Sequence, residues 1–348
     1  MKLFKKALCV LLAVLLLTAS ACASEPTEEP TAPTTTTEPT TETTVPTVPT
    51  EAEPQNINMI TGLDDMGSSS LSRPVGIMVA NNDFIQDEQV GLASADMWVE
   101  IETEGGITRI MAVFANTERV PEAIGPVRSA RSPFFHVVEA LGLAYCHAGG
   151  SYTALGKIAN SYIADLDVNS DDYSWRDTSY PHDYEYTLRT SGDELTRYMN
   201  DRGYKTYAVN EFPWTFGEAT GEAATDISLL LSGYQRVGFE WNEAEGVYYK
   251  TNTANEYRHC DISGAPITAK NVLVLYSDQY WENNTTIDFY LGGGKGYLFS
   301  DGKARRFDWS RDDNGFTMTE EDGSQLTLAP GKVYMCVAST YFESELSY

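Results

Sequence analysis

The chain of 348 residues carries 24 Lys and Arg against 50 Asp and Glu, for a formal charge of -26, and 42% of it is hydrophobic. That hydrophobic share can build cores over a length typical of about two domains, which excludes wholesale disorder. The negative charge argues against a nucleic acid or an anionic membrane surface as the main partner, because both require a basic contact surface. A small basic pocket within an acidic surface is still compatible with this composition.

The N-terminus has the features of an export signal. Lys2, Lys5 and Lys6 precede an apolar run over 7–17 and the small residues of 18–21, which is the order of a signal peptide. The run is shorter than the about 20 residues that cross a bilayer, so we predict a cleaved signal over residues 1–21. Small residues directly before Cys22 resemble a lipobox, which implies diacylation of Cys22 and stable anchoring in the membrane. An ordinary cleavage site at Ala19–Ala21 is the alternative.

Residues 22–56 are predicted to be a disordered tether. Between Ala23 and Gln55 the chain has 12 Thr, 7 Pro and 7 Glu, with no Lys, Arg, Trp, Tyr or Phe, so it cannot bury a core. Its prolines favour a semi-extended spacer. Without the three lysines of the signal, the charge of the chain is -29. The tether accounts for -7 of this through its seven glutamates, so a charge of -22 belongs to the folded part.

Cysteine usage bears on the compartment. Beyond the signal and Cys22, the cysteines are Cys146, Cys260 and Cys336, and no C-x-x-C spacing occurs. We expect at most one disulfide among them. An exported protein with so few disulfides fits a Gram-positive-type envelope better than an oxidising periplasm. We therefore predict a lipid-anchored protein on the extracytoplasmic face of the cell membrane.

Residues 57–222 are predicted to form an N-terminal α/β domain with a mixed sheet. Short β-rich runs cover 75–80, 97–101, 107–114 and 143–146. Helical patterns begin at Pro133 and end at Gly142, extend over 153–163, and run from the capping residue Ser191 to Gly203. Strands that alternate with helices are typical of α/β folds.

Residues 223–348 are predicted to form a C-terminal, β-rich and mostly antiparallel domain, which makes the whole chain α+β or α/β. Turn clusters such as Ser300–Gly302 separate its short β-rich runs. These runs cover 247–251, 272–276, 287–291, 296–299, 304–309, 317–319, 325–328 and 333–337.

Four arginines lie beside small residues where predicted strands end in loops. The ends of strands line the ligand crevice of an open α/β sheet, and guanidinium groups match carboxylates and phosphates. The predicted ligand-binding residues are Arg109, Arg128, Arg131, Arg176, Gly149, Gly150 and Ser151. The structural alternative is that the arginines pair with acids such as Glu100, Glu102, Glu104 and Asp177.

Three residues near these loops are candidates for catalysis. His147 follows a predicted strand, His182 lies in an aromatic loop, and Asp177 follows Arg176. Either histidine could serve as a general base or as a metal ligand, and the structural alternative is an ordinary hydrogen-bonding residue.

No metal or cofactor is expected. The chain has four His and no H-x-x-x-H pattern. The acidic run from Asp165 to Asp171 begins like a calcium loop, but Ser170 stands at its glycine position and Arg176 at its final glutamate position. Gly292–Lys295 lacks the Ser or Thr of a phosphate-binding loop.

Several motifs in order resemble the YerB-like family of bacterial lipoproteins, which have an N-terminal and a C-terminal domain of unknown function. The motifs are RPVGIMV from Arg73, GL from Gly91 with AD from Ala95, EGGITR from Glu104, GPVRSAR from Gly125, HAGGS from His147, RD from Arg176, PH from Pro181, TAKNV from Thr268 and PGK from Pro330. Asp87–Gln89 and Asp183 depart from the family pattern and add negative charge beside the arginines. The resemblance implies location and architecture, and no established activity.

A weaker similarity is to envelope phosphotransferases of the LytR-CpsA-Psr type. It implies that Arg128 and Arg131 bind a diphosphate, while Arg176 or Arg109 stabilises charge in the transition state. We thus expect a lipoprotein that binds a small anionic or sugar-linked envelope ligand. The alternatives are a phosphotransferase or hydrolase acting on wall precursors, and an envelope protein-interaction module for which 21 tyrosines supply contact surface.

Overall fold

The computed structural model describes residues 56–66, 72–170, 172–179, 183–252 and 257–348, apart from the Asn252 side chain. All of them belong to one compact unit, Ala52–Tyr348. The predicted signal peptide, Cys22 and the predicted tether up to residue 55 lie outside the described residues, as does His182.

The described elements are mostly strands. The helices are α1 (Ser132–Leu141), α2 (Tyr152–Ala159) and α3 (Gly192–Arg202). Strands of the first part are β1 (Val75–Ala80), β2 (Met97–Glu102), β3 (Thr108–Phe114), β4 (Ala144–His147), β5 (Ala164–Asp167), β6 (Trp175–Arg176), β7 (Leu188–Arg189), β8 (Thr215–Phe216) and β9 (Glu222–Ala223). The next are β10 (Asp226–Leu230), β11 (Arg236–Asn242), β12 (Val247–Asn252), β13 (Tyr257–Arg258), β14 (Thr268–Ala269), β15 (Asn271–Ser277) and β16 (Gln279–Trp281). The last are β17 (Ile287–Phe289), β18 (Gly293–Ser300), β19 (Lys303–Asp312), β20 (Gly315–Thr319), β21 (Thr327–Leu328) and β22 (Val333–Ser339).

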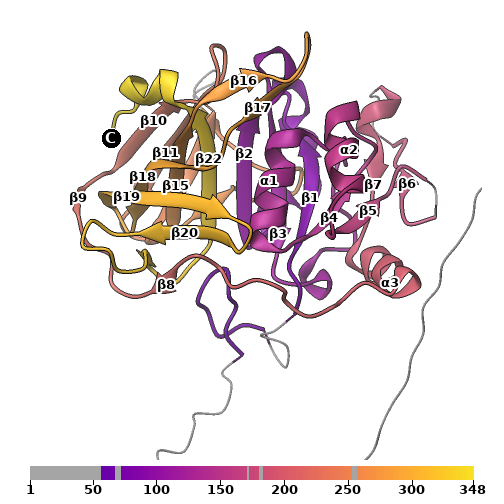
Figure 1. The fold of residues 1–348 in the computed structure, drawn as a ribbon, viewed down its shortest axis with the longest axis horizontal. Helices are drawn as coiled ribbons and strands as arrows, with labels where there is room; N and C mark the ends of the chain where they lie inside the picture. Colours follow the sequence, from indigo (N-terminus) through magenta and orange to yellow (C-terminus); the bar gives the residue numbers. More distant parts are fainter. Residues whose placement is uncertain (1–55, 67–71, 171, 180–182, 253–256) are drawn as a thin grey trace, which may run out of the picture. The chain divides into compact units, whose positions relative to one another are not determined.

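One large mixed sheet runs through the molecule (Figure 1). Its order is β20-β19-β18-β15-β22-β2-β3-β1-β4-β5, with β9 paired to β19. The pairs β15–β22, β22–β2, β1–β4 and β4–β5 are parallel, and the other pairs are antiparallel. The predicted fold class, α/β elements with a mixed sheet followed by antiparallel β structure, is confirmed.

The two predicted domains share this sheet. Strand β22 of the C-terminal part lies between β15 and β2, and Val333 pairs with both Asn271 and Met97. The predicted boundary between residues 222 and 223 falls within β9. Two strands that lie far apart in sequence thus form the centre of the sheet, a pairing that no local pattern indicates.

Different elements cover the two faces of the sheet. On one face, Phe134, Val137 and Val138 of α1 pack with Val99 and Met111, and α1 and α2 lie in front of the sheet in Figure 1. On the other face, the small sheet β10-β11-β12-β13, with β14 paired to β12, packs on Trp98 and Tyr334 through apolar residues that include Phe239 and Tyr248.

Local sequence explains the helix ends. Pro133 stands in the first turn of α1, and Gly142 ends it at φ 67°, a left-handed conformation that glycine adopts without steric cost. The Ser191 side chain accepts a hydrogen bond from the Glu194 amide at the start of α3. Helix α2 ends earlier than predicted, at Ala159, and the half-buried strand β5 follows. Among the described residues, no helix is long and apolar enough to cross a membrane.

A buried polar network joins the large sheet to the small one. The Glu100 carboxylate accepts hydrogen bonds from Asn81, Thr108 and Tyr334 at 2.9, 2.7 and 2.5 Å. Lys250 Nζ, from β12, lies 3.6 Å from Glu100 Oε2 and 3.1 Å from His259 Nδ1. Because each charge has a partner, the network can be excluded from water.

Candidate functional site

The parallel strands of the large sheet all end at one edge. Strands β1, β2, β4, β5, β15 and β22 point in the same direction, so their carboxyl ends lie together, at the top of Figure 1. Ligands of open α/β sheets bind at this edge. The residues that end these strands are Ala80, Glu102, His147, Asp167, Ser277 and Ser339.

Two of the predicted arginines meet at this edge on one carboxylate. Arg109 Nη2, from β3, donates to Glu104 Oε1 at 3.0 Å, and Arg109 Nη1 donates to the Ser129 carbonyl at 2.6 Å. Arg131, which precedes α1, donates from Nε to Glu104 Oε2 at 2.5 Å and from Nη2 to Glu104 Oε1. We call Arg109, Glu104 and Arg131 the arginine–glutamate cluster. Arg109 and Arg131 therefore pair with an acidic side chain, which is the structural alternative that the sequence left open.

The cluster holds more positive than negative charge. Burial of Arg109, together with the charges of Arg131 and Arg128, lowers the pKa of Arg109 to about 9; its guanidinium is still charged at neutral pH. Burial raises the pKa of Glu104, but the hydrogen bond from Arg131 and the charges of both arginines outweigh it and bring that pKa to about 2. One carboxylate thus faces two arginines, which favours an additional anion. The nearby Arg128 pairs with the exposed carboxylate of Glu185 at 3.3 Å.

Arg128 and Arg176 lie on the turn Tyr184–Tyr186 beside the cluster. Arg128 Nη1 donates to the Glu185 carbonyl at 2.9 Å, and its guanidinium lies 4.7 Å from the centre of the Tyr186 ring. Arg176 Nη1 donates to the Tyr184 carbonyl at 2.6 Å, and its guanidinium lies 3.8 Å from the Tyr184 ring centre. Arg128 therefore joins the cluster electrostatically, whereas Arg176 contacts neither Glu104 nor its arginines in any described interaction.

His147 is buried at the end of β4, and none of its described contacts involves Glu104, Arg109 or Arg131. Its Nε2 lies 2.9 Å from Asp165 Oδ1, and its Nδ1 lies 2.9 Å from the Gly149 carbonyl. Both ring nitrogens thus lie against protein oxygens and the residue is 0% exposed, so neither nitrogen faces a position open to a substrate. In the described contacts, His147 orients the following loop.

The loop after His147 supports the cluster through its backbone. The Ala130 amide donates to the Gly149 carbonyl, and the Ser151 amide donates to the Ala130 carbonyl. The Ser151 side chain caps α2 by accepting from the Ala154 amide at 3.2 Å. Gly149, Gly150 and Ser151 thus fix the backbone next to Arg131, while Asp177 accepts from Ser179 within its own exposed loop.

A second set of polar contacts, centred on Asp288 of β17, was not predicted from the sequence. Asp288 of β17 is buried, and its Oδ2 accepts from His136, Lys157 and Tyr280 at 3.0, 2.7 and 3.0 Å. Glu282 pairs with Lys157 at 3.2 Å. These contacts hold the β16–β17 hairpin on α1 and α2. His136 lies on α1 and Lys157 on α2, whereas Tyr280, Glu282 and Asp288 belong to a hairpin far along the chain. The sequence therefore carries no local signal for these contacts.

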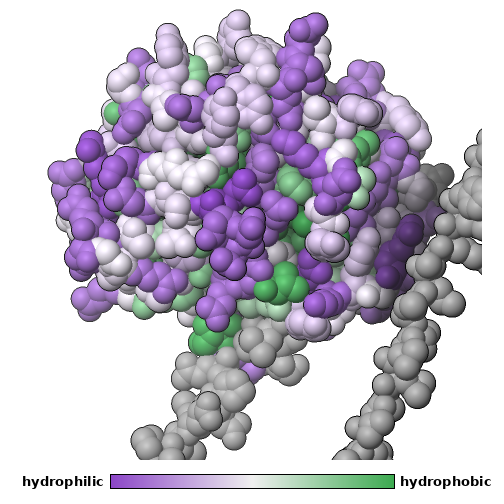
Figure 2. All heavy atoms as spheres, in the orientation of Figure 1, coloured by the Kyte–Doolittle hydropathy of each residue, from purple (hydrophilic) through white to green (hydrophobic). Residues whose placement is uncertain are grey.

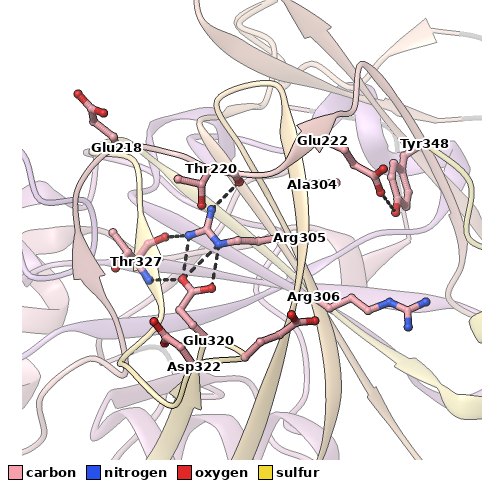
Figure 3. A pocket seen from close by; sticks show the side chains of 11 residues that line it. Glu218, Thr220, Glu222, Ala304, Arg305, Arg306, Glu320, Asp322, Thr327 and Tyr348 are labelled. Carbon is pink, nitrogen blue, oxygen red and sulfur yellow. Dashed lines mark hydrogen bonds and ion pairs between the residues drawn. The ribbon is translucent and has the colours of Figure 1, made fainter.

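Two cavities elsewhere are poor matches for an anion. A cavity of about 640 Å³ is lined by Glu218, Glu222, Glu321, Asp322 and Arg305 among others. Figure 3 shows Arg305 directed at Glu320 and at the carbonyls of Thr220 and Thr327, while Arg306 points away. A second cavity, of about 690 Å³, is lined by Asp165, Asp167, Asp172 and Asp201. Within the described part of the chain, no group of three acidic, His or Cys side chains could hold a metal ion.

The three described cysteines, Cys146, Cys260 and Cys336, are free thiols. Burial raises the pKa of Cys146 and of Cys336, with the nearby carboxylates adding to the effect. A thiol held in its neutral form is a weak nucleophile. Cys146 and Cys336 therefore contribute packing to the sheet.

The fold and this edge define an α+β protein whose single mixed sheet brings arginines together at its carboxyl end. The model of a family described as protein of unknown function (DUF3048), N-terminal domain, matches residues 60–205. The model of the DUF3048 C-terminal domain matches residues 227–335. The chain belongs to this YerB-like family.

Two relatives show how far the similarity extends. YerB, a candidate lipoprotein of Bacillus subtilis (strain 168), is 28% identical over 287 residues, which cover 79% of this chain and 84% of the relative. The crystal structure of the YerB protein from Bacillus subtilis superposes with a TM-score of 0.70 at 25% identity, over 81% of this chain and 96% of that one.

Proposed function

We propose that the protein is a membrane-anchored extracytoplasmic lipoprotein that binds a small anionic or sugar-linked envelope ligand at the arginine–glutamate cluster. The observation that carries the proposal is the convergence of Arg109 and Arg131 on the one carboxylate of Glu104, with Arg128 close enough to lower the pKa of Arg109. The folded part as a whole, with the cluster included, carries a charge of -22. A local excess of positive charge on such a surface favours a specific anion over non-specific attraction.

Binding is favoured over catalysis at this site. The predicted base His147 has both ring nitrogens engaged by Asp165 and the Gly149 carbonyl, and a general base needs a free position within reach of its substrate. The phosphotransferase alternative requires such a group beside the arginines. It is therefore the second candidate, and turnover of a wall precursor by the purified protein is the result that favours it.

The membrane anchor is supported by the leader and by the description of YerB as a candidate lipoprotein. Mass spectrometry of the mature N-terminus should find a diacylated Cys22. The variant Cys22→Ala should leave the membrane fraction, and an unmodified Cys22 in the native protein contradicts the anchor.

The ligand site is tested by calorimetric titration with inorganic diphosphate. Arg131→Gln and Arg128→Gln should each weaken binding by about tenfold, or ~1.4 kcal/mol. Arg306→Gln, at an exposed arginine on β19, should bind like the native protein. Arg109 is avoided because it is 3% exposed and its removal leaves a buried acceptor unpaired. Equal binding by all variants, or none by the native protein, contradicts the proposal.

A further inference from the structure

The loop that carries Glu104 is closed at its base and has a pliable backbone. Glu104, Gly105 and Gly106 lie between β2 and β3, and we call them the EGG loop. The Thr103 amide and hydroxyl both donate to the Ile107 carbonyl, at 2.8 and 3.2 Å, and so join the two ends of the loop. Its glycines have φ of 70° and 78°, and glycine has a wide range of accessible conformations. The position of Glu104 therefore depends on what holds the loop from outside.

The tip of the EGG loop is held by the C-terminal part of the chain. The Ser232 hydroxyl, in the turn between β10 and β11, donates to the Gly106 carbonyl at 2.5 Å and is buried. The same oxygen accepts from the amides of Tyr234 and Gln235, at 3.2 and 3.0 Å, which fixes the turn. The Tyr234 ring lies against Gly106, where a Cβ atom would overlap it. We call Ser232 and Tyr234 the latch.

The latch and the arginines hold opposite ends of the same three-residue loop. Glu104 accepts from Arg109 and Arg131, whereas Gly106 accepts from Ser232. The Glu104 side chain is 30% exposed, against 4% for Arg109 and 14% for Arg131. The carboxylate is thus the member of the cluster most open to solvent, and an anion that arrives from solution must displace it to bind both guanidinium groups.

A carboxylate of the chain itself weakens the binding of an external anion. While the EGG loop is closed, only the small fraction of molecules with an open loop binds an anion at full strength. The apparent dissociation constant rises in inverse proportion to that fraction. Figure 2 shows mainly hydrophilic and neutral residues along the upper edge of the face in view, so opening the loop at this edge exposes little apolar surface to water. The contacts of the loop, and not a hydrophobic core, therefore set its open fraction.

We propose that the latch is an autoinhibitory device, in which the turn of the C-terminal part holds the EGG loop closed over the arginines and its release opens the ligand site. This inference rests on the proposed function, because it concerns access to the same cluster. It couples the two parts of the chain that match separate family domains. Tyr234 is 88% exposed, so the turn is accessible from solution. By linkage, a ligand that displaces Glu104 also loosens the latch.

Two latch variants test the inference, with inorganic diphosphate as the probe and calorimetry on the full chain. Ser232→Ala removes the hydrogen bond to Gly106, and Tyr234→Ala removes the ring beside it. Each should bind diphosphate about threefold to fivefold more tightly than the native protein, because the open fraction rises. The controls are Ser263→Ala, at another turn serine, and Tyr257→Ala, at another exposed tyrosine. Neither control residue contacts the EGG loop in any described interaction, and both variants should bind like the native protein.

A mutant cycle shows whether the latch acts through Glu104. In the Glu104→Gln background, Ser232→Ala should add little affinity, because the charge that the latch holds over the arginines is gone. An equal gain in the two backgrounds contradicts the inference. Hydrogen exchange read by mass spectrometry follows the loop without any ligand. Residues 103–107 should exchange faster in Ser232→Ala than in the native protein or in Ser263→Ala, and unchanged exchange also contradicts the inference.

The diphosphate titrations separate this inference from the proposed function. If the native protein binds diphosphate and both latch variants bind it with native affinity, the latch does not control the site. The inference then fails and the proposed function stands. If the native protein binds no diphosphate, both fail.

Discussion

Lys250 Nζ lies 3.6 Å from Glu100 Oε2, and the two side chains are 1% and 0% exposed. They come from different sheets, β12 and β2, and from the two parts of the chain that match separate domains of the family. The pair therefore joins the two parts through a buried charge contact. Such a contact is costly to break from one side only, because it leaves an uncompensated charge away from water.

Lys250→Met should destabilise the protein by about 3–5 kcal/mol, because Glu100 then lacks its cation. The double variant Lys250→Met, Glu100→Gln should lose less than Lys250→Met alone, since it removes both charges. Urea unfolding followed by tryptophan fluorescence measures both values. A double variant whose loss equals the sum of the two single losses contradicts the coupling.

His259 should make stability fall at acidic pH. Burial and the nearby charge of Lys250 lower the pKa of His259 well below its usual value. The folded state thus keeps the ring neutral, while the unfolded chain takes up a proton below pH about 6.5, so the free energy of unfolding decreases as pH falls. The slope should approach about 1.4 kcal/mol per pH unit for this group.

His259→Gln keeps an acceptor for Lys250 and a donor for Gln89, the two partners of the ring. This variant should lose the acid-dependent part of the slope between pH 6.5 and 5, measured by urea unfolding at each pH. An unchanged slope assigns the pH dependence to other groups.

Glu102 should lower the free energy of unfolding as pH rises, which is opposite to the effect of His259. Burial raises its pKa to about 7, and the hydrogen bond from Gln279 opposes this only in part. The folded state therefore holds a proton that the unfolded chain releases above its ordinary pKa, and stability falls as pH rises from about 4.5 to 7. Glu102→Gln should remove this loss, a gain of about 1–2 kcal/mol at pH 8 after allowance for partial exposure.

The exposed residue Glu240 provides the control, because Glu240→Gln on β11 should leave the pH dependence unchanged. Infrared titration of the carboxylate band, compared between native protein and Glu102→Gln, reads the group directly. If the part of the band that is lost in Glu102→Gln titrates near pH 4, the assignment is contradicted. Since His259 and Glu102 have opposite slopes between pH 5 and 6.5, only the two variants together separate them.

Local sequence predicts the elements whose signals are local. Pro133 and Gly142 mark α1, Ser191 marks the start of α3, and apolar runs mark β1 and β3. Strand β5 is missed because only Ala164 and Leu166 of its four residues are buried. The insertion of β22 between β15 and β2 is missed because it depends on pairing across more than half of the chain. No propensity or turn residue encodes such a pairing.

The candidate site was predicted in part. The arginines of the strand ends indicated where positive charge gathers, since residues after parallel strands share an edge. The sequence left open whether Glu104 pairs with them, because Glu104 and Arg131 lie 27 residues apart and meet only through the fold. Lys250 and Asp288 resemble surface residues in the sequence, and their burial follows from partners on other elements.

Glu104 should compete with the ligand for the arginines. Its carboxylate already occupies the hydrogen-bonding positions of Arg109 and Arg131, so an arriving anion must share or replace them. Glu104→Gln removes the competing charge, and we expect it to bind inorganic diphosphate about tenfold more tightly, measured by calorimetry at pH 7. It should also be less stable without ligand by about 2–4 kcal/mol, because two arginines then lie together with one neutral partner. Added diphosphate should restore part of that stability.

Glu185→Gln, at the exposed carboxylate 3.3 Å from Arg128, is the control. It should show at most a small gain in affinity, because solvent already screens that pair. If Glu104→Gln binds diphosphate no better than the native protein, the anion does not reach the cluster, and Arg109 and Arg131 serve only to hold the edge of the sheet together.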